Sequence, residues 1–250
     1  MDMTGHTILV TGGASGIGRR LAEAFHARGN TVIVAGRRRA ALDAVVAANP
    51  GMVAMELDIA DPAAVAAFAE RLVAEHPALD AVIHNAGIMR REPLAGAPAW
   101  LADAEAMIAT NLTGPIRLTA ALLPHLLAKP KAAILTVTSG LAFVPSTGFP
   151  TYSATKAALH AWTQTLRRQL AETAVEVIEI APPYVQTELT GPQQAVDPRA
   201  MPLADYIAEV LSLLEQVPTP PEIIVERCKP LRFARETGAF DQIFEALAAH

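Results

Sequence analysis

Three side chains in the second half of the chain are of types that could together transfer a proton. Tyr152 and Lys156 stand four residues apart, and Ser139 precedes them. If the segment that holds the pair is helical, the phenol and the ammonium share one helix face. A free phenol has a pKa near about 10, and a nearby ammonium lowers that pKa because it stabilises the phenolate. The pair therefore predicts a general acid for ketone reduction, or a general base for alcohol oxidation.

Ser139 and one further polar residue, Asn111, could complete this reacting centre. Ser139 follows the apolar run Ala132–Val137, and its hydroxyl could hydrogen-bond a carbonyl oxygen on which negative charge develops. Asn111 is ambiguous by its own chemistry, since a buried asparagine that braces a helix kink is an equally good interpretation. A Tyr-x-x-x-Lys pair alone is weak evidence, because surface helices often carry such pairs. Its combination with Ser139 and with a glycine-rich turn is far more specific.

That turn lies near the N-terminus and predicts a site for a dinucleotide. The apolar run His6–Val10 leads into Thr11–Gly18, and a helical pattern follows. Glycines let the backbone approach a pyrophosphate closely, and the first N–H groups of the next helix supply partial positive charge. The turn alone is weak evidence, but its place between the first strand and the first helix strengthens it. The residues expected to contact the cofactor here are Gly12, Ser15, Gly16, Ile17 and Gly18.

The end of the second apolar run predicts which dinucleotide binds. NAD sites usually place an acid there for the ribose hydroxyls, whereas this chain has Arg37 and Arg38 after Gly36. A guanidinium pairs well with phosphate through its planar donor fork. We therefore expect NADP rather than NAD, with Arg37 as the main contact to the 2′-phosphate and Arg38 as a secondary one. The alternative interpretation is a solvated basic helix start.

The third apolar run ends at Asp58 and Ile59, which we also place in the cofactor site. The carboxylate of Asp58 could accept a hydrogen from the adenine amino group. It could equally serve the turn that leads into the next helix, and the sequence leaves both interpretations open.

Short apolar runs alternate along the chain with longer helical patterns, and this predicts the elements that position these residues. The runs are aliphatic without strict polar alternation, as in parallel strands buried on both faces. We expect an α/β fold of the Rossmann type, doubly wound, with a seven-stranded parallel sheet and helices on both faces. The expected strands are His6–Val10, Thr31–Ala35, Met52–Leu57, Asp80–His84, Ala132–Val137, Val175–Ile180 and Glu222–Val225. The expected helices are Ile17–Arg28, Arg39–Ala48, Pro62–Glu75, Ala102–Leu127, Tyr152–Glu172, Pro202–Glu215 and Gly238–Ala249.

Length and composition favour one domain over residues 1–250. The irregular stretch 187–202 follows a strand end and is a candidate substrate lid, with an ordinary connection as the alternative. A net charge of −5 argues against nucleic acid as a partner. One cysteine, Cys228, excludes an intrachain disulfide, and we expect it to be a small buried side chain. We expect no membrane span, no metal site and a cytoplasmic location.

These motifs together resemble the short-chain dehydrogenase/reductase family, in its compact single-domain branch. The resemblance rests on Thr11–Gly18, on Asn85, Ala86 and Gly87, and on Asn111, Ser139, Tyr152 and Lys156, and it covers nearly the whole chain. It implies Tyr152 as the acid/base, Lys156 as its tuner and ribose clamp, and Ser139 as the substrate orienter. It also implies that Asn111 holds a water in a proton relay, and that the chain forms a homodimer or homotetramer.

The resemblance adds further contacts on the nicotinamide side. Asn85, Ala86 and Gly87 would line the floor of that site, and Pro182, Val185 and Thr187 match the loop that contacts the carboxamide. The chain departs from the family pattern at two positions. His84 stands where the family usually has a first asparagine, and Pro183 replaces a glycine, which stiffens the loop. The segments 198–202 and 229–233 are also similar to a subgroup associated with D-alanine esterification of teichoic acids, which says little about substrate.

The side chains expected around the substrate are apolar, and they are Leu141, Phe143, Phe149, Tyr184 and Leu189. This set favours a neutral, hydrophobic ketone or aldehyde over an anionic substrate. The function predicted is an NADPH-dependent carbonyl reductase and alcohol dehydrogenase. Two alternatives stay open. One is a 3-oxoacyl thioester reductase, for which Arg90, Arg91 and Arg117 are the basic groups, and the other is a catalytically silent NADP-binding sensor.

Overall fold

A computed structural model describes residues 2–96 and 98–248 of the chain. Its centre is one parallel sheet of seven strands in the order β3-β2-β1-β4-β5-β6-β7, which confirms the predicted fold class. The order reverses between β1 and β4, and ligands of such sheets bind in the crevice at this point, beyond the carboxyl ends of the strands. The strands are β1 Thr7–Thr11, β2 Thr31–Gly36, β3 Val53–Glu56, β4 Ala81–His84, β5 Ala132–Val137, β6 Val175–Ile180 and β7 Glu222–Ile223.

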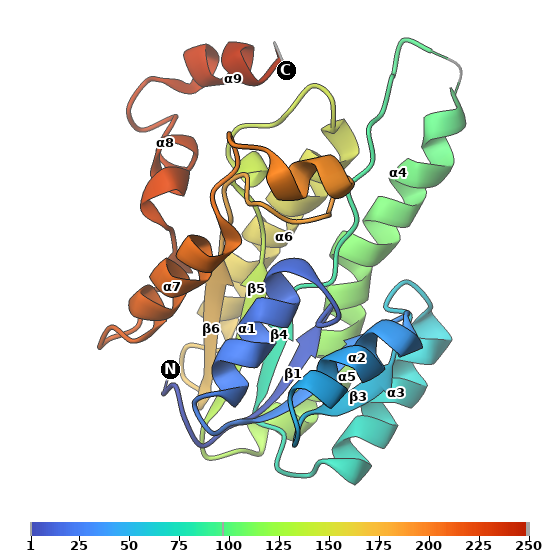
Figure 1. Ribbon diagram of the computed structural model, residues 1–250. Coiled ribbons are helices and arrows are strands. Elements are labelled where there is room, and N and C mark those ends of the chain that lie inside the picture. The colour runs from blue at the N-terminus through green and yellow to red at the C-terminus, as the bar shows by residue number, and fades with distance from the viewer. Residues whose placement is uncertain (1, 97, 249–250) are drawn as a thin grey trace.

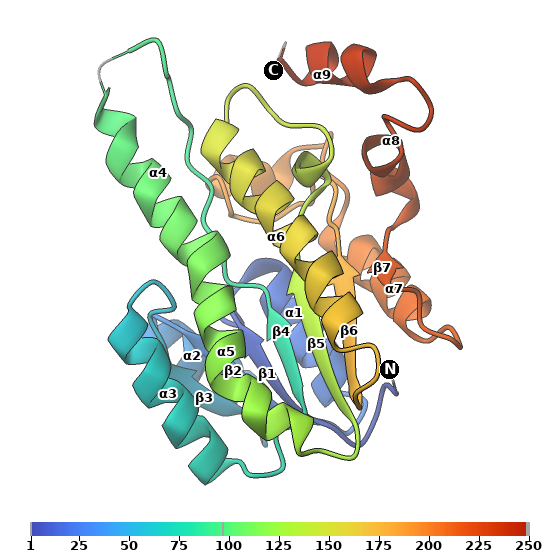
Figure 2. The same ribbon diagram turned by 180° about the vertical axis from the view of Figure 1, so that it is seen from behind.

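Helices cover both faces of the sheet (Figures 1 and 2). On one face, α1, α2 and α7 pack over side chains such as Val10 and Ile180. On the other, α3, α5 and α6 pack over side chains such as Leu9 and Val177. Successive residues of a strand thus enter different cores, which is why the strands are apolar throughout. The longer helices are α1 Gly16–His26, α2 Arg39–Ala48, α3 Pro62–Glu75, α4 Leu101–Ile108, α5 Gly114–Leu127, α6 Pro150–Gln169, α7 Leu203–Leu214 and α9 Phe240–Ala248.

The helix expected over Ala102–Leu127 is interrupted. A π-helical turn, η2 Ala109–Thr113, separates α4 from α5. At the junction a Cβ on Gly114 would lie 2.6 Å from the carbonyl oxygen of Ile59, so only glycine allows this approach. The interruption matters because π turns occur often at functional sites, and this one holds Asn111.

Most of the other elements differ from their expected extent by one to three residues at an end. The last strand is β7 Glu222–Ile223 instead of Glu222–Val225, because the chain turns into the short helix η5 Glu226–Cys228 and then α8 Lys229–Arg232. The final helix α9 lies above the carboxyl ends of the strands in Figure 1, while Ala249 of the expected helix falls outside the described residues. Within the ranges that the structure describes, no helix combines the length and apolar character needed to cross a bilayer.

His84, the departure from the family pattern, is an interior residue of β4. It is 2 % exposed, its Nε2 lies 2.8 Å from the Thr119 hydroxyl, and its Nδ1 has no hydrogen-bond partner among the described residues. Burial lowers the pKa of His84 to about 4. A proton added to this ring would therefore have to be carried in an apolar site without a counter-charge.

Acid is therefore expected to destabilise the fold through His84. In the unfolded chain His84 binds a proton below its ordinary pKa of 6.5, whereas in the folded chain it binds one only near pH 4. The free energy of unfolding therefore falls as the pH falls through this window. The loss is on the order of 3 kcal/mol. Denaturant unfolding at a series of pH values should show a weaker pH dependence for His84→Gln than for wild type. Parallel curves for the two proteins would contradict this account.

Candidate active site

Tyr152, Lys156 and Ser139 come together at the carboxyl edge of the sheet. Tyr152 and Lys156 lie on successive turns of α6, and Ser139 follows the end of β5. All three are buried, at 5 %, 4 % and 8 % exposure. The Lys156 ammonium lies 5.7 Å from the centre of the Tyr152 ring and donates a hydrogen bond of 2.8 Å to the carbonyl oxygen of Val137. The structure thus brings the three predicted catalytic groups into one cluster.

Burial shifts the pKa of both partners. It raises the pKa of Tyr152 to about 12, and a hydrogen bond with the Ser139 side chain acts in the opposite direction. Burial also lowers the pKa of Lys156 to about 8, against an opposing effect of the carboxylate of Glu179. Lys156 therefore carries its charge at neutral pH and loses it in mildly alkaline solution. Because that charge favours the phenolate, the state of Lys156 controls how readily Tyr152 releases a proton.

Asn111 sits in the π turn and is fully buried. Its Oδ1 accepts a hydrogen bond of 2.9 Å from the Ile88 N–H, and its Nδ2 donates to the Ile88 carbonyl at 2.9 Å and to Thr155 Oγ1 at 3.2 Å. The side chain therefore braces the kink against α6 and the loop after β4. A Cβ on Gly87 would lie 3.4 Å from Asn111 Oδ1 and 3.7 Å from Lys156 Nζ. The predicted relay water would bind in this space, and that role stays a prediction.

The glycine-rich turn between β1 and α1 is held by Asn85. Its Nδ2 donates to the carbonyl oxygen of Thr11 at 3.0 Å and lies where a Cβ on Gly18 would come within 2.2 Å. Gly12 and Gly16 have φ of 68° and 54°, a conformation that favours glycine. The Ser15 side chain does not cap the first turn of α1, so it leaves the first backbone N–H groups of this helix without a side-chain acceptor. The predicted residues Gly12, Ser15, Gly16, Ile17, Asn85, Ala86 and Gly87 all line the same cavity, and Gly18 packs behind it.

The other end of this cavity is basic. Arg37 and Arg38 follow β2, line the cavity and are exposed. Arg38 donates a hydrogen bond of 3.1 Å to Ser15 Oγ, so its guanidinium lies beside the glycine-rich turn. Within the described ranges Arg37 has neither a hydrogen bond nor an ion pair. Arg39 differs, because its Nε is paired with Asp43 at 2.9 Å on α2.

Asp58 and Ile59 line the same cavity. Asp58 Oδ1 accepts a hydrogen bond of 3.0 Å from the Ala60 N–H, which is the turn role left open by the sequence. Asp58 is exposed and its Oδ2 makes no hydrogen bond within the described ranges. The predicted contact of this carboxylate with an adenine amino group is therefore compatible with its role in the turn, and it stays a prediction.

The loop after β6 closes the cavity on the nicotinamide side. Pro182, Val185 and Thr187 line it, and a Cβ on Gly16 would lie 3.6 Å from Thr187. The expected lid, 187–202, is anchored by Gln194, which is 6 % exposed. Its Nε2 donates to the Val185 carbonyl at 2.8 Å and to Thr187 Oγ1 at 3.0 Å.

The cavity has a volume of about 790 Å³ and runs from the arginines to the reacting centre. Four of the expected substrate residues line it, namely Leu141, Phe149, Tyr184 and Leu189. Phe143 is not among the described residues of its wall. The Phe143 ring packs edge-on against His160 at 4.9 Å and under the Arg232 guanidinium at 5.1 Å, so we correct its assignment to a structural one.

Several wall residues were missed by sequence reasoning. Gln194 holds the lid, and Leu231 and Leu247 from the C-terminal segment complete the apolar wall. Leu247 could have been suspected from the helical periodicity of Phe240, Ile243, Phe244 and Leu247. This pattern predicts an apolar helix face, but it does not show what the face covers. Leu231 gave no local signal, because its place depends on how the chain returns over β7.

His160, Glu179 and Glu222 form a group whose ligand-type atoms lie within 4.8 Å of one another. The three residues are far apart along the chain, so no local pattern in the sequence predicts this group. Arg232 already binds Glu222, with Nε to Oε2 at 2.6 Å, so a guanidinium supplies the positive charge beside this carboxylate. We therefore interpret the group as a network of ion pairs and hydrogen bonds.

Comparison with known proteins is consistent with this geometry. Residues 6–197 match the model of the short chain dehydrogenase family. The chain is 39 % identical over 251 residues to an uncharacterized oxidoreductase, DltE, of Bacillus subtilis, covering 99 % of this chain and 98 % of the other. It is 32 % identical to 3-oxoacyl-[acyl-carrier-protein] reductase FabG of Escherichia coli, covering 76 % and 78 %.

A solved structure shares the whole architecture. A short-chain dehydrogenase from Sphingobium yanoikuyae, in complex with NADPH, superposes with a TM-score of 0.80 at 28 % identity, covering 97 % of this chain and 94 % of that one. Because the family model spans most of the chain and the Bacillus subtilis relative matches 99 % of it, this protein belongs to the short-chain dehydrogenase/reductase family of oxidoreductases.

Proposed function

We propose that this protein is an NADPH-dependent reductase of hydrophobic ketones that also oxidises the corresponding secondary alcohols. The observation that carries the proposal is the buried cluster of Tyr152, Ser139 and Lys156 at one end of a cavity whose other end holds a glycine-rich turn and two exposed arginines. The cavity is long enough to place a dinucleotide along the sheet edge with its reactive ring beside the cluster.

Each residue of the cluster has a distinct role in the proposal. Ser139 holds the substrate oxygen, and Tyr152 donates a proton to that oxygen as negative charge develops on it. Lys156 remains charged and favours the phenolate that is left behind. A bound nicotinamide supplies or accepts the hydride. In the oxidative direction the same groups work in reverse, so Tyr152 removes the proton from the alcohol.

The residues present fit NADP. The glycine-rich turn leaves no room for side chains at Gly12 and Gly18, and the N-terminus of α1 faces the cavity without a side-chain cap from Ser15. Arg37 would hold the 2′-phosphate, with Arg38 beside it. No carboxylate stands at the end of β2, where a ribose with two free hydroxyls would need an acceptor.

The walls near the reacting centre support an apolar substrate. The wall includes Leu141 and Phe149, from the connection between β5 and α6, and Leu189, from the loop after β6. Leu231 and Leu247 extend this wall. Burial of apolar surface, rather than a charged clamp, would therefore hold the substrate.

A direct test is a substrate screen with purified protein. Ketones of increasing apolar size are offered with NADPH and with NADH, and oxidation of the cofactor is followed by its absorbance. We expect turnover with NADPH, and kcat/KM that increases with apolar size until the pocket is filled. Tight NADPH binding without turnover of any ketone, aldehyde or thioester would instead support the silent sensor.

A second candidate substrate is a 3-oxoacyl thioester, favoured by the likeness to the Escherichia coli reductase. Arg91 lies at the cavity, with its guanidinium 5.2 Å from the centre of the Phe149 ring, and Arg90 lines the cavity beside it. Arg117 is exposed on α5 and bonds Thr113. Comparing kcat/KM for a free ketone and its acyl thioester separates the two candidates. The homodimer or homotetramer expected from the sequence stays a prediction.

A further inference from the structure

A buried carboxylate lies directly behind the reacting centre. Glu179, on β6, is 0 % exposed. It accepts a hydrogen bond of 2.6 Å from the hydroxyl of Thr138, the residue next to Ser139. The backbone on the other side of Thr138 accepts the hydrogen bond from Lys156, through the carbonyl of Val137. The segment 137–139 therefore connects Glu179, Lys156 and Ser139.

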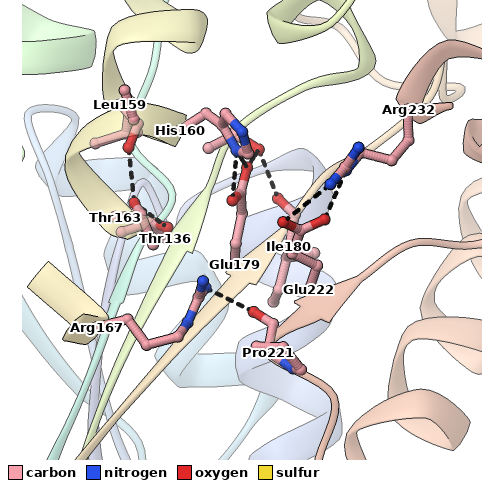
Figure 3. Close-up of polar contacts among 12 residues, drawn as sticks. Thr136, Leu159, His160, Thr163, Arg167, Glu179, Ile180, Pro221, Glu222 and Arg232 are labelled. Atoms are coloured by element: carbon pink, nitrogen blue, oxygen red, sulfur yellow. Dashed lines mark hydrogen bonds and ion pairs between the residues drawn. The ribbon is translucent and has the colours of Figure 1, made fainter. Parts of the chain in front are cut away.

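Burying an isolated carboxylate is unfavourable, so its partners define what it does. Glu179 and Glu222 are register partners on β6 and β7, and their side chains share one face of the sheet. Arg232 binds Glu222 from α8, and the His160 ring on α6 places its Nδ1 2.8 Å and 2.9 Å from the two Glu179 oxygens (Figure 3).

The charged groups around Glu179 can be taken one by one to find which cation could balance its carboxylate. Arg232 neutralises Glu222, since its guanidinium contacts both carboxylate oxygens at 2.6 Å and 3.4 Å. Cys228, in η5, is uncharged because burial raises its pKa to about 12, and the charge of Glu179 acts in the same direction. The His160 ring satisfies the carboxylate by donating Nδ1–H. Arg167 and Lys156 are further cations on α6. Arg167 donates hydrogen bonds to the carbonyl oxygens of Val177 and Pro221, whereas Lys156 lies one helical turn from His160.

We propose that Glu179 is a positioning residue, the buried counter-charge that keeps Lys156 protonated beside Tyr152. The proposal rests on the proposed function for its catalytic meaning, but not for its physical content. One further observation supports it. Burial lowers the pKa of Lys156, and the charge of Glu179 raises it. Without this carboxylate, Lys156 would lose its charge closer to neutral pH and Tyr152 would lose the charge that favours its phenolate.

The test is a titration of Lys156 itself. The chain has four lysines, at positions 129, 131, 156 and 229, so their side-chain NMR signals can be assigned with Lys156→Met. In Glu179→Gln the amide oxygen remains an acceptor for Thr138, the negative charge is lost, and one carboxylate oxygen beside His160 becomes an NH2 group. We expect the pKa of Lys156 to fall by about one unit, a tenfold change in its ionisation equilibrium. Glu176→Gln removes the same charge from the same strand, where the side chain points to the other face, and should leave Lys156 unchanged.

The failures are distinguishable. An unchanged pKa of Lys156 in Glu179→Gln would overturn the proposal and would mark His160 as the partner that satisfies Glu179. This titration needs no substrate, so it stands even if the wild-type protein reduces no carbonyl compound. If turnover is found, the alkaline limb of the pH profile should move toward lower pH in Glu179→Gln by the same amount. An equal loss of rate at every pH would indicate a merely structural role.

A second measurement serves if Glu179→Gln folds poorly. Thermal unfolding of Lys156→Met, Glu179→Gln and the double variant forms a double-mutant cycle. Two opposite charges that depend on each other should make the double variant more stable than the sum of the two single changes indicates. Additive effects would overturn the proposal.

Discussion

Tyr152→Phe is expected to lower kcat for carbonyl reduction by about 10²–10⁴-fold, the usual contribution of a positioned acid. The change removes the hydroxyl that we propose as the proton donor to the substrate oxygen, while the aromatic ring still fills its buried place on α6. The lost hydrogen bond with Ser139 is worth about 1 kcal/mol, so the protein should remain folded. The affinity for NADPH, measured by fluorescence or calorimetry, should change little.

Tyr206→Phe is the matched control for this experiment. Tyr206 is also buried, on α7, and its hydroxyl has no hydrogen-bond partner in the part of the chain that the structure describes. Removing that hydroxyl should leave kcat unchanged and should not lower the melting temperature. If Tyr152→Phe retained turnover within a few-fold of wild type, another group would have to donate the proton, and the acid/base role of Tyr152 would be rejected.

Much of the fold follows from local patterns in the sequence. Aliphatic runs that alternate with amphipathic segments specify parallel strands with crossover helices, and the first β-α-β unit is marked by its glycines. The pair of Tyr152 and Lys156 is also local, because four residues on a helix fix the relation of the two side chains. Ser139 could be placed with them because the ends of parallel strands meet the starts of the following helices along one edge.

The missed features depend on contacts between distant segments. Glu179 faces Glu222 only because β6 and β7 pair in one register, and Arg232 reaches them only because the chain turns back after β7. Phe143 was misplaced for the same reason, since Arg232 and His160 enclose its ring. A kink at Asn111 was left open by the sequence, but one continuous helix was expected there, because a π turn leaves almost the same residue periodicity as a continuous helix.

The presence of Glu179 in the interior of the sheet is explained by its polar partners. A lone carboxylate in the interior of a sheet conflicts with the apolar pattern of β6, and in the sequence it looks like an exception. In the structure it has a hydroxyl, an imidazole and, as we propose, an ammonium to satisfy it. Departures from a strand pattern next to a predicted catalytic residue are therefore useful markers of groups that tune a site.

The second large effect is expected at the cofactor. Arg37→Asp should weaken NADPH binding by about 100-fold or more, because a charge-assisted contact of about 1.5–3 kcal/mol is replaced by repulsion between a carboxylate and a phosphate. NADH has no 2′-phosphate, and a carboxylate at this position can accept hydrogen bonds from the two ribose hydroxyls. Its affinity should stay level or rise, so the ratio of the two dissociation constants reverses.

A matched pair of alanine variants isolates the contribution of position 37. Arg37 follows β2 and lines the cavity, whereas Arg39 is two residues further on and its guanidinium is held by Asp43 on α2. Arg37→Ala should weaken NADPH binding by about 10-fold or more, while Arg39→Ala loses only an exposed i,i+4 ion pair of about 0.3–0.5 kcal/mol. Equal effects of the two variants would mean that the basic segment acts through its overall charge. A wild-type preference for NADH would show that the end of β2 does not select the phosphate at all.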